Sequence, residues 1–244
     1  LISDTHLGRT GDIKRERLDL IDNCFDFCKQ NGIHIIIHGG DFIDGLMDPR
    51  YDFENPIKAQ AEQIDYAINH YPYDKDILTF LVIGNHDYDA YARCGQNLAI
   101  ALNDRRHDIV PFGIGCGKMR VKNDSFLVTH RLMNGENPRL LRDPHILRFN
   151  GHTHRMRFRL RSGTLIIDIP ALVEFDNAPQ DLHSALKVRL DFEKGYFKTV
   201  LVEQYLVDYR FQKISEGMFD LNKNLKVKSD YVALEEPMIK ARIL

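Results

Sequence analysis

Short apolar runs that end directly in glycine and a polar side chain place the strongest constraint on how this chain folds. Residues 33–38 lead into Gly39-Gly40-Asp41, and residues 77–83 lead into Gly84-Asn85-His86-Asp87. Runs this rich in β-branched residues and bounded by glycine are typical of strands buried on both faces. Residues 12–31 predict an amphipathic helix before the first run. The order strand, helix, strand indicates a βαβ unit with parallel strands.

The rest of the chain continues this α/β pattern and then changes character. A helix with an apolar stripe is predicted within residues 45–75, and another over 91–104. Short strands follow near 110–112, 118–122, 125–129 and 146–149. Residues 155–206 predict antiparallel strands, with hairpins at Ser162-Gly163 and Lys194-Gly195. We expect one domain over 1–244, with a motif-bearing core at 1–175, hairpins from 176 and a surface tail from Asp208.

The composition excludes several classes of protein. With 43% hydrophobic and 28% charged residues and a net charge of −2, the chain is typical of a globular protein. No apolar run approaches the roughly 20 residues of a membrane helix, and the net charge favours neither nucleic acid nor an anionic membrane. Cys24, Cys28, Cys94 and Cys116 form no CxxC pair, which favours a reducing cytoplasm. Cys24 and Cys28 are interpreted as buried small hydrophobes.

The chain begins almost inside a motif, Ser3-Asp4-Thr5-His6. A strand that leads into Asp4 ordinarily has more than three residues, so we expect further residues before Leu1. A targeting signal therefore stays an open question.

Polar side chains follow five predicted strands, and each could bind a metal ion. They are Asp4 and His6, Asp41, Asn85 and His86, His130, and His152 and His154. Buried imidazole and carboxylate groups are costly unless they are paired or bound to metal. This mixture of nitrogen and oxygen ligands suits Mn, Fe, Zn or Ni and is too rich in imidazole for Mg or Ca. Two ions that share a carboxylate, about 3.5–4 Å apart, would use the whole set.

The order of these motifs resembles the signature of calcineurin-like metallophosphoesterases. All five blocks are present in order: Asp4-Thr5-His6, Gly40-Asp41, Gly84-Asn85-His86-Asp87, His130 and Gly151-His152-Thr153-His154. The opening block looks most like the branch of repair-type nucleases and class III cyclic-nucleotide phosphodiesterases. The resemblance implies a four-layer α-β-β-α fold, in which two mixed sheets are flanked by helices and the site lies at one sheet edge.

The resemblance also implies a role for each motif residue. Asp4, His6, His154 and a bridging Asp41 would hold one metal ion, and Asp41, Asn85, His130 and His152 would hold the other. His86 would act as general acid, with Asp87 orienting it. A hydroxide between two cations has a lowered pKa and can attack phosphorus, while imidazole, which ordinarily titrates near neutral pH, can protonate the leaving group. Manganese is the ion we favour.

The substrate is left open by the sequence. We favour a phosphodiesterase acting on a nucleotide or another small diester, over a phosphomonoesterase of small molecules or phosphoproteins. A scaffold without activity ranks last, because every expected ligand is present. The residues after His154 are largely needed for core hairpins, which argues against a processive nuclease with a further capping domain. Binding of nucleic acid and the oligomeric state are not decided by the sequence.

Arginines near the motifs suggest contacts with phosphate. Arg131 follows His130 and is a candidate phosphate clamp, since Arg suits bidentate contact. Asn85 is the second candidate for binding the substrate. Arg155, Arg157, Arg159 and Arg161 alternate with apolar residues and share one face of a strand. They could form a track for a phosphate backbone, but we favour a solvated face that protects an edge strand. Asp44 could support a metal ligand from outside the ligand set, but we favour a turn carboxylate. His34 and His38 are interpreted as residues of the strand itself.

Overall fold

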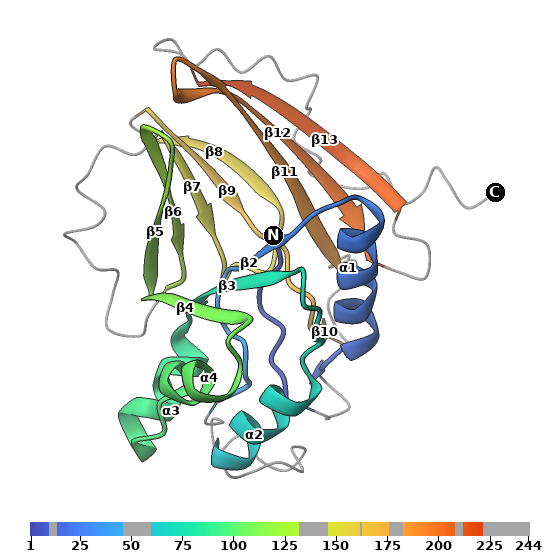
Figure 1. Cartoon of the computed structure of the whole chain (residues 1–244), viewed down its shortest axis with the longest axis vertical. Helices are drawn as coiled ribbons and strands as arrows, with labels where there is room; N and C mark the ends of the chain where they lie inside the picture. Colours follow the sequence, from blue (N-terminus) through green and yellow to red (C-terminus); the bar gives the residue numbers. More distant parts are fainter. Residues whose placement is uncertain are drawn as a thin grey trace.

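The computed structural model describes residues 1–9, 14–45, 60–131, 146–161, 163–175, 183–207 and 212–221. These residues form an α/β fold of four helices and two principal β-sheets (Figure 1). The helices are α1 (Leu18–Gln30), α2 (Gln60–His70), α3 (Asn85–Cys94) and α4 (Leu98–Arg105). None of the described helices is long and apolar enough to cross a membrane.

The larger sheet is mixed and has eight strands in the order β2-β3-β4-β5-β6-β7-β9-β8. The strands are β2 (Ile35–His38), β3 (Leu78–Ile83), β4 (Ile109–Ile114), β5 (Cys116–Val121), β6 (Asp124–Thr129), β7 (Leu147–Asn150), β8 (Arg157–Arg161) and β9 (Thr164–Asp168). β2, β3 and β4 are parallel, as are β6, β7 and β9. Of the strand predicted before α1, only an isolated parallel bridge between Ile2 and His38 is present, whereas β2 after the helix is a full strand.

The second sheet is wholly antiparallel, so the expectation of two mixed sheets is wrong. It consists of β11 (Ser184–Glu193), β12 (Tyr196–Leu206) and β13 (Gln212–Asp220). β13 was expected to belong to a surface tail, because its sequence is mostly polar and alternates weakly. Its Phe219 is nevertheless buried, and pairing with β12 supplies the backbone hydrogen bonds. A two-stranded sheet joins β1 (Lys14–Arg15) to β10 (Glu174–Phe175).

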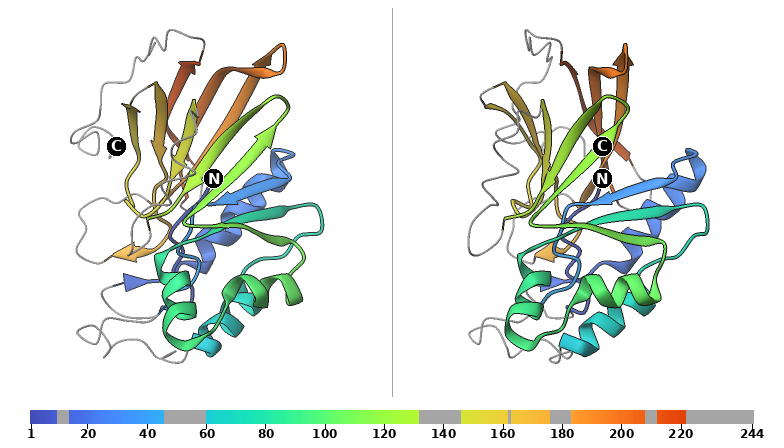
Figure 2. Two further views of the ribbon diagram at one scale, coloured as in Figure 1. Left: turned by 90° about the vertical axis from the view of Figure 1, so that its left-hand side faces the viewer. Right: turned by 60° about the vertical axis from the view of Figure 1, so that its left-hand side comes forward.

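Two apolar cores lie on opposite faces of the larger sheet. Helices α1 to α4 pack with Ile36, Leu81 and Ile109 on one face of β2 to β4. On the other face, Val128, Phe149 and their neighbours pack against the second sheet. Figure 2 shows how strongly the larger sheet curls, since β2 to β4 run across the direction of β6 to β9. The helices therefore cover only one half of their face of the sheet.

The helix predicted at 91–104 is instead two helices. α3 begins at Asn85, directly after the Gly84 cap, and ends before Gly95, which has the left-handed φ of 68°. The side chain of Asn97 then caps α4 by accepting a hydrogen bond from the Ile100 amide at 3.2 Å. The helix predicted at 12–31 begins only at Leu18. Residues 46–59, the first part of the segment in which a helix with an apolar stripe was predicted, lie outside the described residues, as do residues 132–145.

Candidate dinuclear metal centre

The first cluster able to hold a metal ion consists of Asp4, His6 and His154, whose ligand atoms lie within 4.8 Å of one another. Nε2 of His154 lies 3.0 Å from Oδ1 of Asp4. That oxygen is buried and, within the described residues, accepts no hydrogen bond. Two ligands bonded to one ion at about 2.1 Å stand roughly 3 Å apart when the angle between them is near 90°. The geometry and the unsatisfied oxygen both fit a shared cation.

The second cluster consists of Asp41, His130 and His152, and the amide of Asn85 joins it. The Asn85 Oδ1 atom lies 3.1 Å from Nε2 of His130 and 2.9 Å from Nδ1 of His152. Oδ2 of Asp41 lies 3.0 Å from the same His130 nitrogen. These residues follow four different strands, so the convergence of strand ends predicted from the sequence is present.

Asp41 lies between the two clusters. Besides its 3.0 Å contact with His130 in the second cluster, its Oδ2 atom lies 3.9 Å from Nε2 of His6 in the first. The other oxygen, Oδ1, accepts a hydrogen bond from the backbone amide of His86 at 2.9 Å. One carboxylate is thus fixed by the backbone and directs its second oxygen toward ligands from both clusters.

The histidines are oriented by atoms outside the two clusters. Nδ1 of His130 donates to the Gly39 carbonyl at 2.8 Å, which leaves Nε2 to face Asp41. Nδ1 of His6 lies 3.2 Å from Oδ1 of Asp44. Both side chains are completely buried. Such contacts fix the ring and its tautomer in metal sites. The sequence interpretation of Asp44 as a turn carboxylate was therefore incomplete.

A third cluster of His6, Asp44 and His86 overlaps the first. Nη1 of Arg9 lies 2.9 Å from Oδ2 of Asp44 and supplies a positive charge there. Because Asp44 already contacts a guanidinium and His6, we interpret this cluster as support for His6.

His86 and Asp87 have different surroundings although they are adjacent. The His86 side chain is one-third exposed, and its Nε2 atom lies 4.0 Å from Oδ2 of Asp41. Its Nδ1 atom donates to the Asp44 carbonyl at 2.5 Å, so Nε2 is the nitrogen left to exchange a proton. Asp87 was expected to orient His86. Its carboxylate instead accepts from the backbone amides of Gly84 at 2.8 Å and Ile43 at 2.9 Å.

Most of the predicted ligands have an unusual backbone. Asp4 and His6 have φ values of 54° and 45°, and His152 and His154 have values of 73° and 59°. An extended Asp-x-His segment would place both side chains on one face. Here the left-handed conformation at Asp4 and His6 replaces it. Such a conformation costs a non-glycine residue roughly 1–3 kcal/mol. It is retained where the surrounding structure enforces it, which is mostly at functional sites. Asp41, at 53°, shares it.

Glycine allows the strand ends to approach closely. A Cβ atom on Gly84 would lie 2.3 Å from Oδ1 of Asp41, and one on Gly40 would lie 2.4 Å from Nδ1 of His130. A larger residue at either position would displace a ligand. This explains why glycine precedes Asp41 and Asn85.

Burial and charge shift the pKa values within the clusters in opposite directions. Burial alone would lower the pKa of His130, but the nearby carboxylates of Asp41 and Asp4 and the Gly39 carbonyl raise it to about 10. Burial raises the pKa of Asp41, whereas His130, His86 and His6 together hold it well below its usual range. The pKa of Asp4 is also lowered, because contacts with His154 and His130 outweigh its burial. The carboxylates are therefore ionised and able to bind cations.

The other predicted polar residues are placed as follows. His38 is buried, accepts from the Gly40 amide at 3.2 Å and contacts Thr5 Oγ1 at 3.0 Å, which confirms that it belongs to the strand interior. His34 is exposed and contacts the Asp76 carbonyl. Arg131 is exposed beside the buried His130. Cys24 and Cys28 are buried and unpaired by disulfide, as predicted.

The fold brings two clusters of carboxylate and imidazole groups together, and each could hold a metal ion. Residues 1–156 match the calcineurin-like phosphoesterase family. The chain belongs to this family, as the sequence motifs indicated. A search of curated proteins found no match.

Solved structures of similar shape include three small proteins. A novel archaeal phosphodiesterase is 18% identical with a TM-score of 0.45, and covers 82% of this chain and 96% of its own. The Escherichia coli phosphoesterase Yfce is 14% identical with a TM-score of 0.47, covering 88% and 95%. Vacuolar protein sorting 29 from Cryptosporidium parvum is 13% identical with a TM-score of 0.47, covering 90% and 95%. The family assignment rests on the match over residues 1–156.

Proposed function

We propose that this protein is a phosphoester hydrolase that uses two divalent metal ions. Asp4, His6 and His154 hold one ion and Asn85, His130 and His152 hold the other. Asp41 is the ligand common to both. The observation that carries the proposal is the position of Asp41 Oδ2, 3.9 Å from Nε2 of His6 and 3.0 Å from Nε2 of His130.

The residues present fit this pair of ions. Among the residues that the structure describes, none donates a hydrogen bond to the buried Asp4 Oδ1 atom. The ligand groups are carboxylate, amide and imidazole, which suit manganese, iron, zinc or nickel. Manganese is the ion we favour. Such ions, when bound, would acidify a water nucleophile and neutralise charge on the phosphate oxygens.

His86 is proposed as the general acid. Its Nδ1 atom is held by the Asp44 carbonyl, and its Nε2 atom faces the clusters from the exposed side of the site. A proton on Nε2 could be transferred to the leaving oxygen of the substrate. The proposed role of Asp87 is indirect: its carboxylate fixes the turn at Gly84, from which His86 projects. Arg131, exposed next to His130, is the proposed phosphate clamp.

We favour phosphodiesters over phosphomonoesters, as the opening motif suggests. The alternative is a phosphomonoesterase, and a scaffold without activity is the last. The complete set of ligands and the presence of His86 argue against the scaffold, because a protein without catalytic activity does not require these residues.

Hydrolysis of bis(p-nitrophenyl) phosphate and of p-nitrophenyl phosphate, with added manganese, tests the proposal. We expect the wild type to favour the diester. His86→Ala should keep its metal content and lose activity by roughly 10²–10⁴-fold, the usual contribution of a general acid. Preference for the monoester would establish the alternative. A wild type that binds two ions and cleaves neither compound would contradict the proposal.

A further inference from the structure

The outer face of strands β5 to β9 carries a concentration of basic side chains beside the proposed metal centre. Strand pairing puts Lys118, Leu127, Arg148, Ile166 and Arg159 in one row across this face. Two residues along the same strands, Arg120 is paired with Ser125 and Arg161 with Thr164. Arg157 lies in the row of Asp168, Asn150 and Thr129. We call these six cationic residues the basic face: Lys118, Arg120, Arg148, Arg157, Arg159 and Arg161.

The cationic side chains of the basic face reach solvent, whereas Leu127 and Ile166 between them are buried. Five of its members are exposed, and Arg148 is half-buried. Asp168 is the one acidic residue in these rows, and it is buried. The second sheet covers the opposite face, and helices α1 to α4 pack near β2 to β4. In a chain of net charge −2, six cations on three of these five strands, β5, β7 and β8, are a local feature.

Hydrogen bonds fix part of the basic face in place. Arg159 Nη2 lies 2.5 Å from Oδ1 of Asp168, which also accepts from the Asn150 amide at 2.9 Å. Arg148 Nε donates to Thr129 Oγ1 at 2.9 Å, and that hydroxyl donates to Asn150 Oδ1 at 2.9 Å. The network thus connects two of the arginines through buried polar groups.

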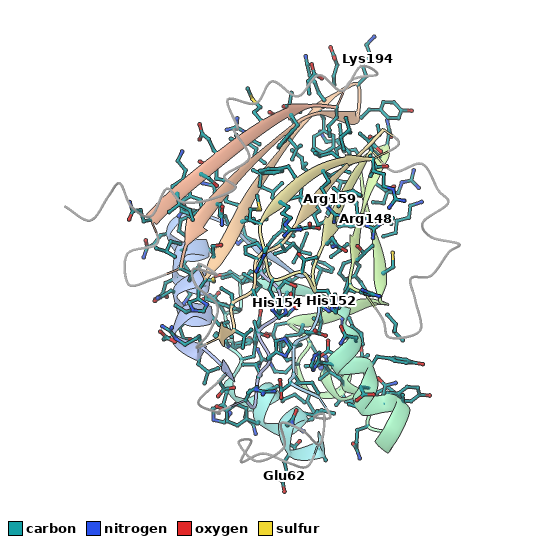
Figure 3. The ribbon with its side chains drawn as sticks, turned by 180° about the vertical axis from the view of Figure 1, so that it is seen from behind. Glu62, Arg148, His152, His154, Arg159 and Lys194 are labelled. Atoms are coloured by element: carbon teal, nitrogen blue, oxygen red, sulfur yellow. The ribbon has the colours of Figure 1, made fainter. Side chains whose placement is uncertain are left out.

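The same network adjoins the proposed metal centre. Thr129 immediately precedes His130, and Asn150 precedes Gly151-His152. Figure 3 shows Arg148 and Arg159 on the strands that lead to His152 and His154. A ligand that extends from the metal centre across these strands would pass over the basic face.

Protection of a sheet edge accounts for only part of this pattern. β8 is indeed the edge strand, as expected from its arginines. Arg148 lies on β7 and Lys118 and Arg120 on β5, which are interior strands of the same sheet. Protection of the β8 edge does not require cations on the interior strands β5 and β7.

We infer that the basic face binds the phosphate backbone of a single nucleic-acid strand whose scissile phosphodiester lies at the metal centre. The inference rests on the proposed function and names its substrate class. Five strands spaced about 4.8 Å apart span roughly 19 Å, which is long enough for several phosphates. The rows contain no aromatic side chain on which a base could stack, so the contacts are expected to be independent of base sequence.

Binding is tested with a fluorescent single-stranded oligonucleotide, followed by anisotropy in EDTA so that no cleavage occurs. The variant is Arg120→Glu/Arg157→Glu/Arg161→Glu, which spares the arginines bound to Asp168 and Thr129. Its control is Lys75→Glu/Arg189→Glu/Lys198→Glu, with the same change in net charge on other surfaces. The wild type and the control should bind alike, and the variant at least tenfold more weakly.

The salt dependence sharpens the test. Each phosphate contact with a single strand contributes about 0.7 to the slope of log K against log salt, so losing three contacts should reduce it by about 2. Hydrolysis of bis(p-nitrophenyl) phosphate should be unchanged in the variant, which also verifies its folding. If the glutamates prevent folding, the corresponding triple glutamine variant replaces them and should also bind more weakly than the wild type.

The results separate the two proposals. A wild type that cleaves the aryl diester but binds no oligonucleotide, or binds it equally after the triple substitution, would overturn the inference alone. Equal weakening in the control would indicate attraction by net charge and would also overturn it. A wild type that binds the oligonucleotide through the basic face and cleaves no phosphodiester would support the surface while contradicting the proposed function.

Discussion

Oδ1 of Asp44 lies 3.2 Å from Nδ1 of His6, and both side chains are completely buried. This contact leaves Nε2 of His6 directed toward Asp41, at 3.9 Å. Asp44 also contacts Arg9, and its backbone carbonyl holds His86. One residue outside the proposed ligand set therefore orients a ligand and the proposed general acid.

Replacement of Asp44 should weaken metal binding without removing a ligand. Contacts of this kind typically change metal affinity by roughly 10–100-fold, and we expect Asp44→Ala to fall in that range. Competition with a fluorescent chelator measures the affinity. Asp74→Asn, which alters an ion pair with Lys29, is the control and should bind as the wild type does. An unchanged affinity in Asp44→Ala would mean that the His6 contact is not needed.

Metal binding should depend on pH because of His130. In the metal-free protein its pKa is about 10, so Nε2 must release a proton when it binds an ion. The apparent affinity should rise by about tenfold per pH unit between pH 7 and 9, because one proton competes with the ion. Titration calorimetry at pH 7.5 in buffers of different ionisation enthalpy should give about one proton released per chain from this residue. Affinity independent of pH over this range would contradict the prediction.

The same shift affects the stability of the metal-free fold. The folded-state pKa lies above the ordinary value of 6.5, so the protonated ring is stabilising. This contribution is fully present below pH 6.5 and is lost as pH rises through about 10. A His130→Gln variant should lose that part of the pH dependence of unfolding.

Asp87 and His86 should respond differently to substitution. Each carboxylate oxygen of Asp87 accepts one backbone hydrogen bond, from Gly84 or from Ile43. Asp87→Asn replaces one of these oxygens by an NH2 group that cannot accept, and should lower the free energy of unfolding by about 2 kcal/mol. Its activity should fall by less than that of His86→Ala. Chemical denaturation and aryl diester hydrolysis measure the two effects. Unchanged stability with a loss of rate equal to that of His86→Ala would restore the role of Asp87 in orienting His86.

The sequence contained enough information to place the strand ends together. Asp41, Asn85, His130 and His152 each follow an apolar strand, and parallel strands bring their carboxyl ends to one edge. The left-handed backbone at Asp4 and His6 was not predicted, because neither residue is glycine and an Asp-x-His segment reads naturally as extended.

Contacts over long sequence separations could not be predicted. Asp44 meets His6 across 38 residues, and its spacing after Gly40-Asp41 is typical of an ordinary turn. The basic face depends on strand order and register, which bring Arg148 and Arg159 into one row through Ile166. The local sequence of β8 showed only its own arginines. β13 was missed because its pairing with β12, more than its own pattern, makes it a strand.

The shared role of Asp41 is tested most directly by counting bound metal. Wild type and Asp41→Ala would be loaded with manganese, dialysed and analysed by inductively coupled plasma mass spectrometry, with circular dichroism to verify folding. Two ions per chain are predicted for the wild type, and fewer than one for a folded Asp41→Ala, because both clusters lose a ligand. One ion or none in the wild type, or two retained by Asp41→Ala, would contradict the account.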